Sequence, residues 1–265
     1  MTATWNRYRL SLLASALVLL LSGCVTTTTG GFNVDASAEQ AVQDYVQLAI
    51  AYYDAGDMQG ARRHLDNARR INERHPAIYN VIALVLQTEG DLDLAEENFR
   101  RAIALDRDNS RARNNYAVLL FGQGRYREAY EQLQPVTQDV NYPGRAIAFE
   151  NLGRAALRIG EEDDAVRAFT RALQLNTNLY VSSLELAILR ADRGEWDAAW
   201  RRLQQYITTV DFYGVPHTPR ALLAGIQIGQ QRHDQELVDN FVLILTTLYQ
   251  DSPEYVLYQR LTDAN

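Results

Sequence analysis

The residues that could carry chemistry in this 265-residue chain are few and scattered. Four consecutive carboxylates, Glu161 to Asp164, could form a cation site, but they precede an apolar helical pattern and favour a role at a helix start. The four histidines do not have the spacing of metal ligands; they are His64, His75, His217 and His233. The sequence contains no HExxH, GxxxxGKS/T or GxSxG motif, and no GxGxxG motif after a strand. We therefore predict no catalytic residue, no metal site, no cofactor and no small-molecule substrate, and a protein that acts by binding.

The single cysteine, Cys24, follows a segment with the dimensions of a secretory signal peptide. Arg7 and Arg9 precede a twelve-residue apolar run from Leu10 to Leu21. This run is too short to span a membrane, because a spanning helix needs about 20 apolar residues. The sequence therefore predicts that residues 1–23 are a signal peptide that is cleaved.

The residues Leu21-Ser22-Gly23-Cys24 resemble the lipobox of bacterial lipoproteins. This resemblance implies cleavage before Cys24 and acylation of its thiol, palmitate included, and stable anchoring requires more than one acyl chain. Val25 follows the cysteine, and by resemblance to enterobacterial lipoproteins the absence of Asp at this position implies the outer membrane. The protein would then face the periplasm on a flexible tether, residues 24–38, which is rich in Thr and Gly up to about Ser37.

The charge balance argues against one class of partner. The formal net charge is −7, and all 26 cationic residues are arginine. Removal of the signal peptide takes away two arginines and no acid, which leaves 24 arginines against 33 acids. Such a surface repels phosphate backbones, so we predict no nucleic-acid partner.

The rest of the chain is an internal repeat. A small residue recurs after intervals of 34, 34, 36 and 34 residues, at Ala49, Ala83, Ala117, Gly153 and Ala187. Seven residues after each comes a glycine, and twelve residues after each comes an alanine. A large apolar residue follows four positions later, at Leu65, Phe99, Leu133, Phe169 and Leu203. Within each half, apolar residues have the period of a helix.

This pattern is that of the tetratricopeptide repeat. We predict an all-α fold over residues 39–265: a right-handed superhelix of about six helix-turn-helix repeats, with a short C-terminal helix and no sheet. Glycine should end the first helix of each repeat in a left-handed conformation. Pro135 should shorten or kink the second helix of repeat three, a two-residue insertion lies within 139–145, and residues 210–219 should form a loop.

A binding groove is expected along the first helices, at positions outside the packing signature. Counting three before, one after and four after each small residue gives fifteen positions, and the candidates taken from them are Val46, Ile50, Tyr53, Asn80, Leu84, Asn114, Val118, Phe121, Glu150 and Arg154. The apolar members could receive an amphipathic or extended peptide, and the polar members could fix its register. The alternative is that the superhelix is tight and these residues bury one another.

Several segments together resemble the type IV pilus biogenesis/stability lipoproteins, the PilF/PilW-type pilotins. The segments are LSGCV (21–25), NNYAVLL (114–120), GRYREAY (124–130), YPGRAIAFENLG (142–153), ALQLN (172–176) and YQDSPEY (249–255). The resemblance implies an outer-membrane lipoprotein that binds the pilus secretin subunit and promotes its localisation and multimerisation. An alternative interpretation is that the protein is another tetratricopeptide lipoprotein adaptor, serving outer-membrane protein assembly or peptidoglycan hydrolases. The insertion at 139–145 argues against this interpretation, because generic repeats lack it.

Overall fold

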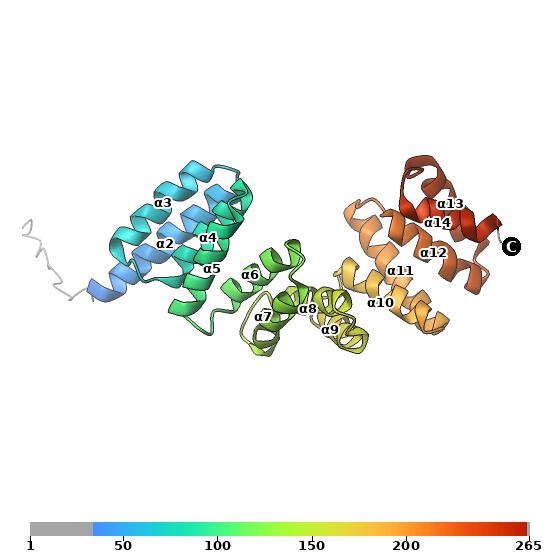
Figure 1. Ribbon diagram of the computed structural model, residues 1–265, viewed down its shortest axis with the longest axis horizontal. Helices are drawn as coiled ribbons and strands as arrows, with labels where there is room; N and C mark the ends of the chain where they lie inside the picture. Colours follow the sequence, from blue (N-terminus) through green and yellow to red (C-terminus); the bar gives the residue numbers. More distant parts are fainter. Residues whose placement is uncertain (1–33, 264–265) are drawn as a thin grey trace, which may run out of the picture. The chain divides into compact units, whose positions relative to one another are not determined.

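The structure is a computed structural model that describes residues 34–263, and its regular secondary structure there is entirely helical (Figure 1). The helices are α2 (Val34–Asp54), α3 (Met58–Ile71), α4 (Pro76–Glu89), α5 (Leu92–Leu105), α6 (Ser110–Gly122), α7 (Tyr126–Gln138), α8 (Arg145–Arg158), α9 (Glu162–Leu175), α10 (Tyr180–Asp192), α11 (Trp196–Tyr213), α12 (Pro219–Arg232), α13 (Gln235–Leu248) and α14 (Pro253–Asp263). None of these helices is long and apolar enough to cross a membrane. The predicted all-α repeat fold, with a short C-terminal helix after the repeats, is confirmed.

Two compact units divide the chain, residues 1–41 and residues 42–265. In the first unit the structure describes only the opening turns of α2, which starts at Val34 and so includes part of the predicted tether. Cys24 and the predicted signal peptide lie outside the described residues. The second unit contains the repeats.

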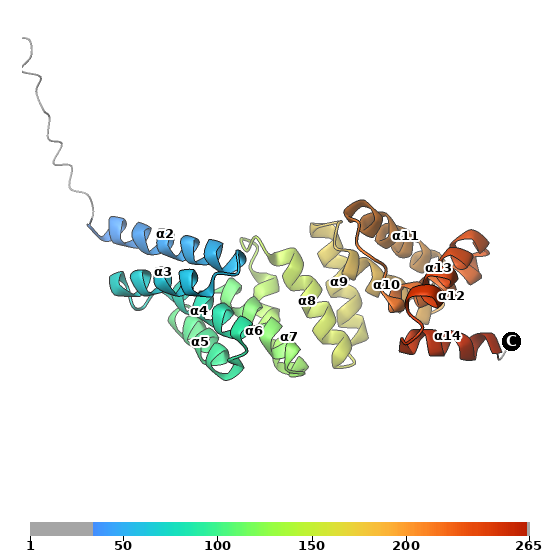
Figure 2. The same ribbon diagram turned by 90° about the horizontal axis from the view of Figure 1, so that it is seen from above.

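Each repeat of the second unit is a pair of consecutive helices, the first lined up against the second. Helix α4 packs on α5, α6 on α7, α8 on α9, α10 on α11 and α12 on α13. The first helices also contact one another from repeat to repeat, α4 with α6, α6 with α8, and α8 with α10. Figure 2 shows the two helices of one repeat, α8 and α9, side by side. The first helices therefore form a continuous layer, as a tetratricopeptide stack requires.

The turn inside each of the first five repeats depends on glycine. Gly90 has φ of 91°, and its N–H donates to the carbonyl of Gln87 at 3.2 Å. The N–H of Asp91 donates to the carbonyl of Leu86 at 2.9 Å, so the free carbonyls at the end of α4 are satisfied. The other predicted turn glycines also have positive φ: Gly56, Gly124, Gly160 and Gly194. The prediction that glycine ends the first helix is confirmed for the first five repeats, whereas in the sixth α12 ends at His233, with φ of 56°.

The small residues of the repeat are where its two helices approach closely. Ala83 and Ala95 are fully buried, and so is Phe99, the large residue that fills the space between α4 and α5. In repeat four the small residue of the first helix is Gly153, where a Cβ atom would lie 2.7 Å from the ring of Phe169. The fully buried Phe169 has no room to move aside. Glycine at this position is therefore a packing requirement.

Two local predictions concern helix ends. Helix α7 contains Pro135, continues three residues beyond it to Gln138 and is one residue shorter than α5 and α9, so the predicted shortening amounts to one residue. The predicted loop 210–219 begins later than expected, because α11 continues to Tyr213 and ends at Gly214 with φ of 63°. Val210 is fully buried, and this packing keeps the last turn of α11 helical.

We expect Gly153→Ala to lower the free energy of unfolding by about 1–3 kcal/mol, because the added methyl group overpacks the contact with Phe169. Gly122→Ala is the matched control, since a Cβ at this helical position meets no atom within 4 Å. The control should be neutral or stabilising by up to about 1 kcal/mol. Urea denaturation of both variants measures the difference; equal stabilities would contradict the close approach.

Candidate functional site

A cavity of about 240 Å³ opens between α6, α7 and α8, on the layer of first helices. We call it the groove cavity; its lining is Ala117, Val118, Phe121, Gly122, Leu133, Asn151 and Arg154. Three of these, Val118, Phe121 and Arg154, are predicted groove residues from two different repeats. The structure therefore brings part of the predicted groove together at the junction of repeats three and four.

The lining of the groove cavity is an apolar wall beside one cation. Val118 is 44% exposed, although it is a large apolar residue. The guanidinium of Arg154 lies over the ring of Phe121 at 4.8 Å, and Tyr126 meets the same ring edge-on with centroids 5.0 Å apart. This arrangement fits an apolar side chain of a partner, with Arg154 free to bind a carbonyl or carboxylate beside it.

The apolar groove candidates of repeats one and two are less accessible to a partner than Val118, because they pack against the core. Val46 is 4% exposed and belongs to the core between α2, α3 and α4. Ile50 and Tyr53 are partly buried against that core, and Leu84 packs in the same manner against the core of repeats two and three. The expectation that Val46 lines an open groove is wrong, because the first helices of neighbouring repeats pack tightly here.

The polar candidates join neighbouring repeats to each other. The amide of Asn115 donates to Oδ1 of Asn80 at 3.0 Å, and that of Asn151 donates to Oδ1 of Asn114 at 3.2 Å. Asn80 and Asn114 are both buried. The third contact of this kind follows: Oε2 of Glu150 accepts from the backbone N–H and the hydroxyl of Ser182, at 3.0 and 2.8 Å.

These contacts form a ladder along the first helices, and they account for Asn80, Asn114 and Glu150 as structural residues rather than peptide contacts. The sequence prediction missed the donors of the ladder. Asn115 and Asn151 both lie two residues before the small residue of their repeats, and this recurrence was a usable signal.

The predicted insertion is held in place by its own contacts. The hydroxyl of Ser110 donates to Asp139 at 2.6 Å, and Nε of Arg145 donates to the carbonyl of Thr137 at 2.8 Å. Burial raises the pKa of Tyr142. At the tip, Val140 is 72% exposed. The insertion is therefore an ordered surface feature and a second candidate for partner contact.

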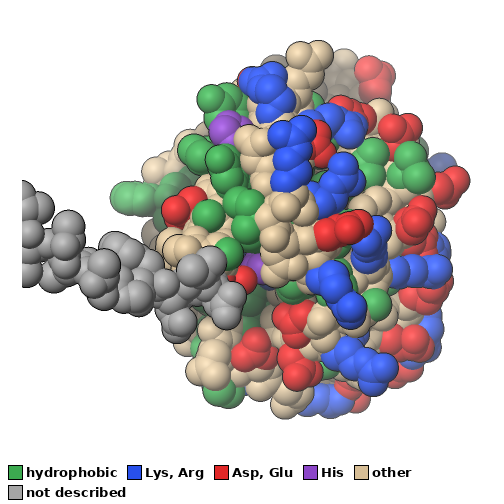
Figure 3. All heavy atoms as spheres, turned by 90° about the vertical axis from the view of Figure 1, so that its left-hand side faces the viewer, with side chains coloured by type: hydrophobic (Ala, Val, Ile, Leu, Met, Phe, Trp, Pro, Cys, Tyr) green, Lys and Arg blue, Asp and Glu red, His purple; other side chains and the backbone are tan. Residues whose placement is uncertain are grey.

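The carboxylate cluster at the start of α9 is neutralised by arginine. Asp163 pairs with Arg193 at 2.8 Å, and Glu161 pairs with Arg127 from the preceding repeat at 3.6 Å. At the end of the molecule where α2 to α5 lie, arginine and acidic side chains likewise interleave over one side of the surface, while hydrophobic side chains gather on the other (Figure 3). Residues 34–263 contain no group of three or more His, Cys, Asp or Glu side chains that could hold a metal ion.

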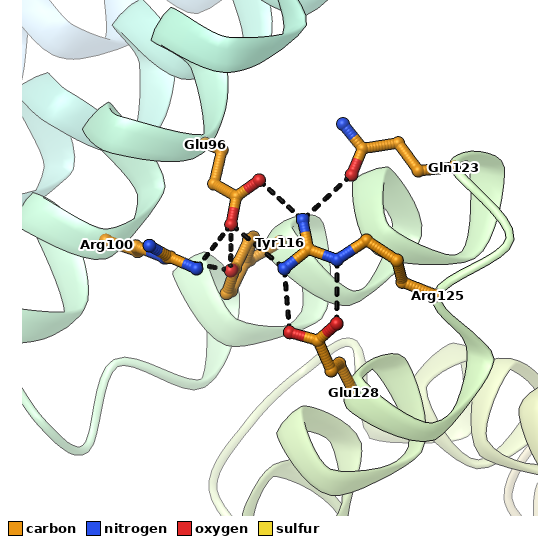
Figure 4. Close-up of polar contacts among 6 residues, drawn as sticks. All are labelled: Glu96, Arg100, Tyr116, Gln123, Arg125 and Glu128. Atoms are coloured by element: carbon orange, nitrogen blue, oxygen red, sulfur yellow. Dashed lines mark hydrogen bonds and ion pairs between the residues drawn. The ribbon is translucent and has the colours of Figure 1, made fainter.

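A polar cluster of six residues lies between repeats two and three (Figure 4). Arg125 bonds Glu96 at 2.6 Å and Glu128 at 2.7 Å, and the hydroxyl of Tyr116 donates to Glu96 at 2.7 Å. The hydrogen bond from Arg125 lowers the pKa of Glu96, whereas burial raises the pKa of Tyr116. Both shifts move titration further from neutral pH, so the cluster is suited to holding repeats together and not to proton transfer.

We expect Glu96→Gln to lower the free energy of unfolding by about 1–3 kcal/mol at pH 7, because it removes the negative charge and one of the two carboxylate oxygens that accept from Arg125 and Tyr116. The lowered pKa of Glu96 means that its contribution is complete above the ordinary glutamate pKa. It is lost as the pH falls through the lower folded-state value. The difference between wild type and variant should therefore shrink below about pH 4.

Glu97→Gln is the matched control for this measurement, since Glu97 is the adjacent, exposed glutamate. Denaturant titrations at several pH values should show no comparable change for it. A Glu96→Gln effect that persists at low pH would contradict a role for the carboxylate charge.

Comparison with known proteins agrees with the repeat architecture. Tetratricopeptide repeat models match residues 46–110 and 117–179, and a second such model matches residues 86–141. Over 252 residues the chain is 34% identical to the type IV pilus assembly protein PilF of Pseudomonas aeruginosa, covering 92% of this chain and 97% of that one. The chain belongs to the PilF family.

One solved structure supports this family membership, and a second shows the same fold. A structure of Pseudomonas aeruginosa PilF matches with a TM-score of 0.79 and 32% identity, over 84% of this chain and 99% of that one. A crystal structure of PilW, a type IV pilus biogenesis factor, has the same fold, with a TM-score of 0.67 and 23% identity over 83% of this chain and 99% of that one. The repeat fold and the PilF relationship together indicate a protein-interaction role and not an enzymatic one.

Proposed function

We propose that this PilF-family protein is an outer-membrane pilotin of type IV pilus biogenesis. In this proposal Cys24 is acylated, the repeats bind the pilus secretin subunit, and the complex reaches the outer membrane, where the secretin forms multimers. The observation that carries the proposal is the groove cavity, where Val118, Phe121 and Arg154 converge. The family relationship supplies the pilus context, and the lipobox resemblance supplies the anchor.

The groove cavity sets a limit on how much of the partner it holds. A cavity of about 240 Å³ accommodates one or two apolar side chains. Burying a Leu or Phe side chain contributes about 1.5–3 kcal/mol, so the cavity alone gives weak binding. A longer segment must therefore lie along neighbouring first helices or contact the insertion near Val140. Arg154 adds direction, because a cation beside an apolar wall distinguishes the two ends of an extended segment.

The groove cavity is tested by Val118→Glu, which places a charge on its exposed apolar wall. We expect at least a roughly tenfold loss of secretin multimers, because the glutamate replaces the apolar wall by a carboxylate and occupies Arg154, and both changes oppose entry of an apolar partner side chain. Multimers are measured by immunoblot of envelope fractions, with the circular dichroism spectrum of the variant as the test of folding. Polar substitution at Ile50 is less informative, since Ile50 packs against the core of repeat one.

Leu94→Glu is the matched control, because Leu94 is 51% exposed on the outer surface of α5 and lines no part of the groove cavity. Val140→Glu tests the insertion in the same assay. Normal multimers with Val118→Glu would rule out the groove cavity, and a loss confined to Val140→Glu would move the contact to the insertion. Normal secretin multimers in a strain that lacks the whole protein would instead favour the alternative function, that of another tetratricopeptide lipoprotein adaptor.

The lipid anchor is tested by Cys24→Ala, which removes the only thiol of the chain. We expect the variant to disappear from the outer-membrane fraction and to accumulate as soluble or unprocessed protein. Val25→Asp keeps the thiol and, by the enterobacterial resemblance, should leave the acylated protein in the inner membrane. Membrane fractionation with an immunoblot distinguishes these cases; unchanged outer-membrane location of Cys24→Ala would refute the anchor.

A further inference from the structure

A second hollow, of about 580 Å³, opens between α9, α10 and α11, where repeat four meets repeat five. We call it the arginine hollow; its lining is Thr170, Leu186, Arg190, Ala198, Arg201, Arg202 and Gln205. Most of its lining comes from α9 and α11, the second helices of these repeats, whereas most of the lining of the groove cavity comes from the first helices α6 and α8. The two sites are therefore separate, and nothing in the pilotin proposal uses this one.

Two of the three arginines of the hollow, Arg190 and Arg202, occupy positions that are neutral in repeats two to four. Arg190 lies three residues after the small residue Ala187, and the same position holds the buried Leu86, Leu120 and Ala156 in repeats two to four. Repeat five therefore places a cation where its neighbours place core side chains.

The second helix shows the same substitution. Arg202 lies three residues after Ala199, where repeats two to four have Asn98, Gln132 and Ala168. Packing of the repeat does not require a guanidinium at this position.

The charge of the hollow is only partly compensated. Within the described chain, Arg190 forms an ion pair with Glu195, but Arg202 donates to a neutral acceptor, Oε1 of Gln205, at 2.8 Å. Burial lowers the pKa of Arg202, and repulsion from Arg190 and Arg201 lowers it further. None of the residues that line the hollow is acidic. A partly buried cation next to two other cations is electrostatically unfavourable, and a bound anion would stabilise it.

The neighbouring hollow of the same layer provides an internal comparison. It lies between α7, α8 and α9, with a volume of about 710 Å³, and Arg167 and Arg171 line it. There, however, Asp164 is also in the lining, where it pairs with Arg167 and accepts from Tyr130. An inter-repeat hollow therefore does not by itself produce an uncompensated cluster of cations.

We propose that the arginine hollow binds an acidic peptide segment of a protein partner. Two or more carboxylates of the segment would accept from Arg201 and Arg202 in bidentate geometry, which suits the planar guanidinium fork. Leu186 and Ala198 provide an apolar floor for the carbon chains of acidic residues. The overall negative charge of the protein repels anions elsewhere, so the hollow is selective for a segment that can enter it.

The proposal is tested with a fluorescein-labelled octaglutamate peptide, titrated against the intact protein at low ionic strength and followed by fluorescence anisotropy. We expect saturable binding that Arg201→Glu weakens by at least about tenfold. Arg201→Lys should weaken it by about threefold, because lysine keeps the charge and loses the fork. Arg202→Gln is a second test, with thermal melts to confirm folding, and Arg201 itself is exposed and suits substitution.

Arg70→Glu is the matched control, since Arg70 is an exposed arginine in the last turn of α3 and its replacement changes the net charge equally. We expect it and Val118→Glu to bind octaglutamate like the wild type. Absence of binding at peptide concentrations up to about 1 mM would overturn the proposal.

Equal weakening by Arg70→Glu would overturn it too, because the attraction would then be unspecific. Competition by inorganic phosphate at the same concentration as the peptide would show that the hollow holds a small anion and not a peptide. None of these results depends on secretin multimers, so the arginine hollow and the pilotin function fail or succeed separately.

Discussion

The close approach of two helices at a small residue is the contact on which the structure depends. Ala83 against α5, and Gly153 against Phe169, set how near the two helices of a repeat lie. The same separation leaves the first helix free to contact the first helix of the next repeat, which the asparagine ladder then fixes in register. A larger side chain at the small position would therefore disturb its own repeat and also the layer that carries the groove cavity.

The predictable part of the fold is the part that each repeat encodes by itself. Turn glycines, buried alanines and the large residue between them recur at fixed intervals, and the structure has them where the sequence indicates. Val118, Phe121 and Arg154 were also identified by register alone. The burial of Val46 could not be predicted in this way. It depends on how tightly α2 packs on α4, and the position of a residue within the repeat does not specify that distance.

The polar groove candidates failed for a related reason. A position outside the packing signature of one repeat can still face the next repeat, and Asn80, Asn114 and Glu150 do so. The last turn of α11 shows the reverse case: Gly214 and Pro216 indicate a loop, but burial of Val210 keeps the preceding residues helical. In both cases tertiary packing determines the burial or the secondary structure of these residues, which the local sequence signal alone does not specify.

The ladder and the ion pairs between repeats have a consequence for how the chain folds. Asn80 and Asn115 are 35 residues apart, and Glu150 and Ser182 are 32 apart, so each repeat is joined to the next by contacts of short sequence separation. Chains dominated by such contacts have low contact order and fold rapidly. Their stability is close to a sum over neighbouring repeats, and structure can spread from any of them. Amide hydrogen exchange should accordingly be slowest in the central repeats and faster toward the two ends, where a repeat has only one neighbour.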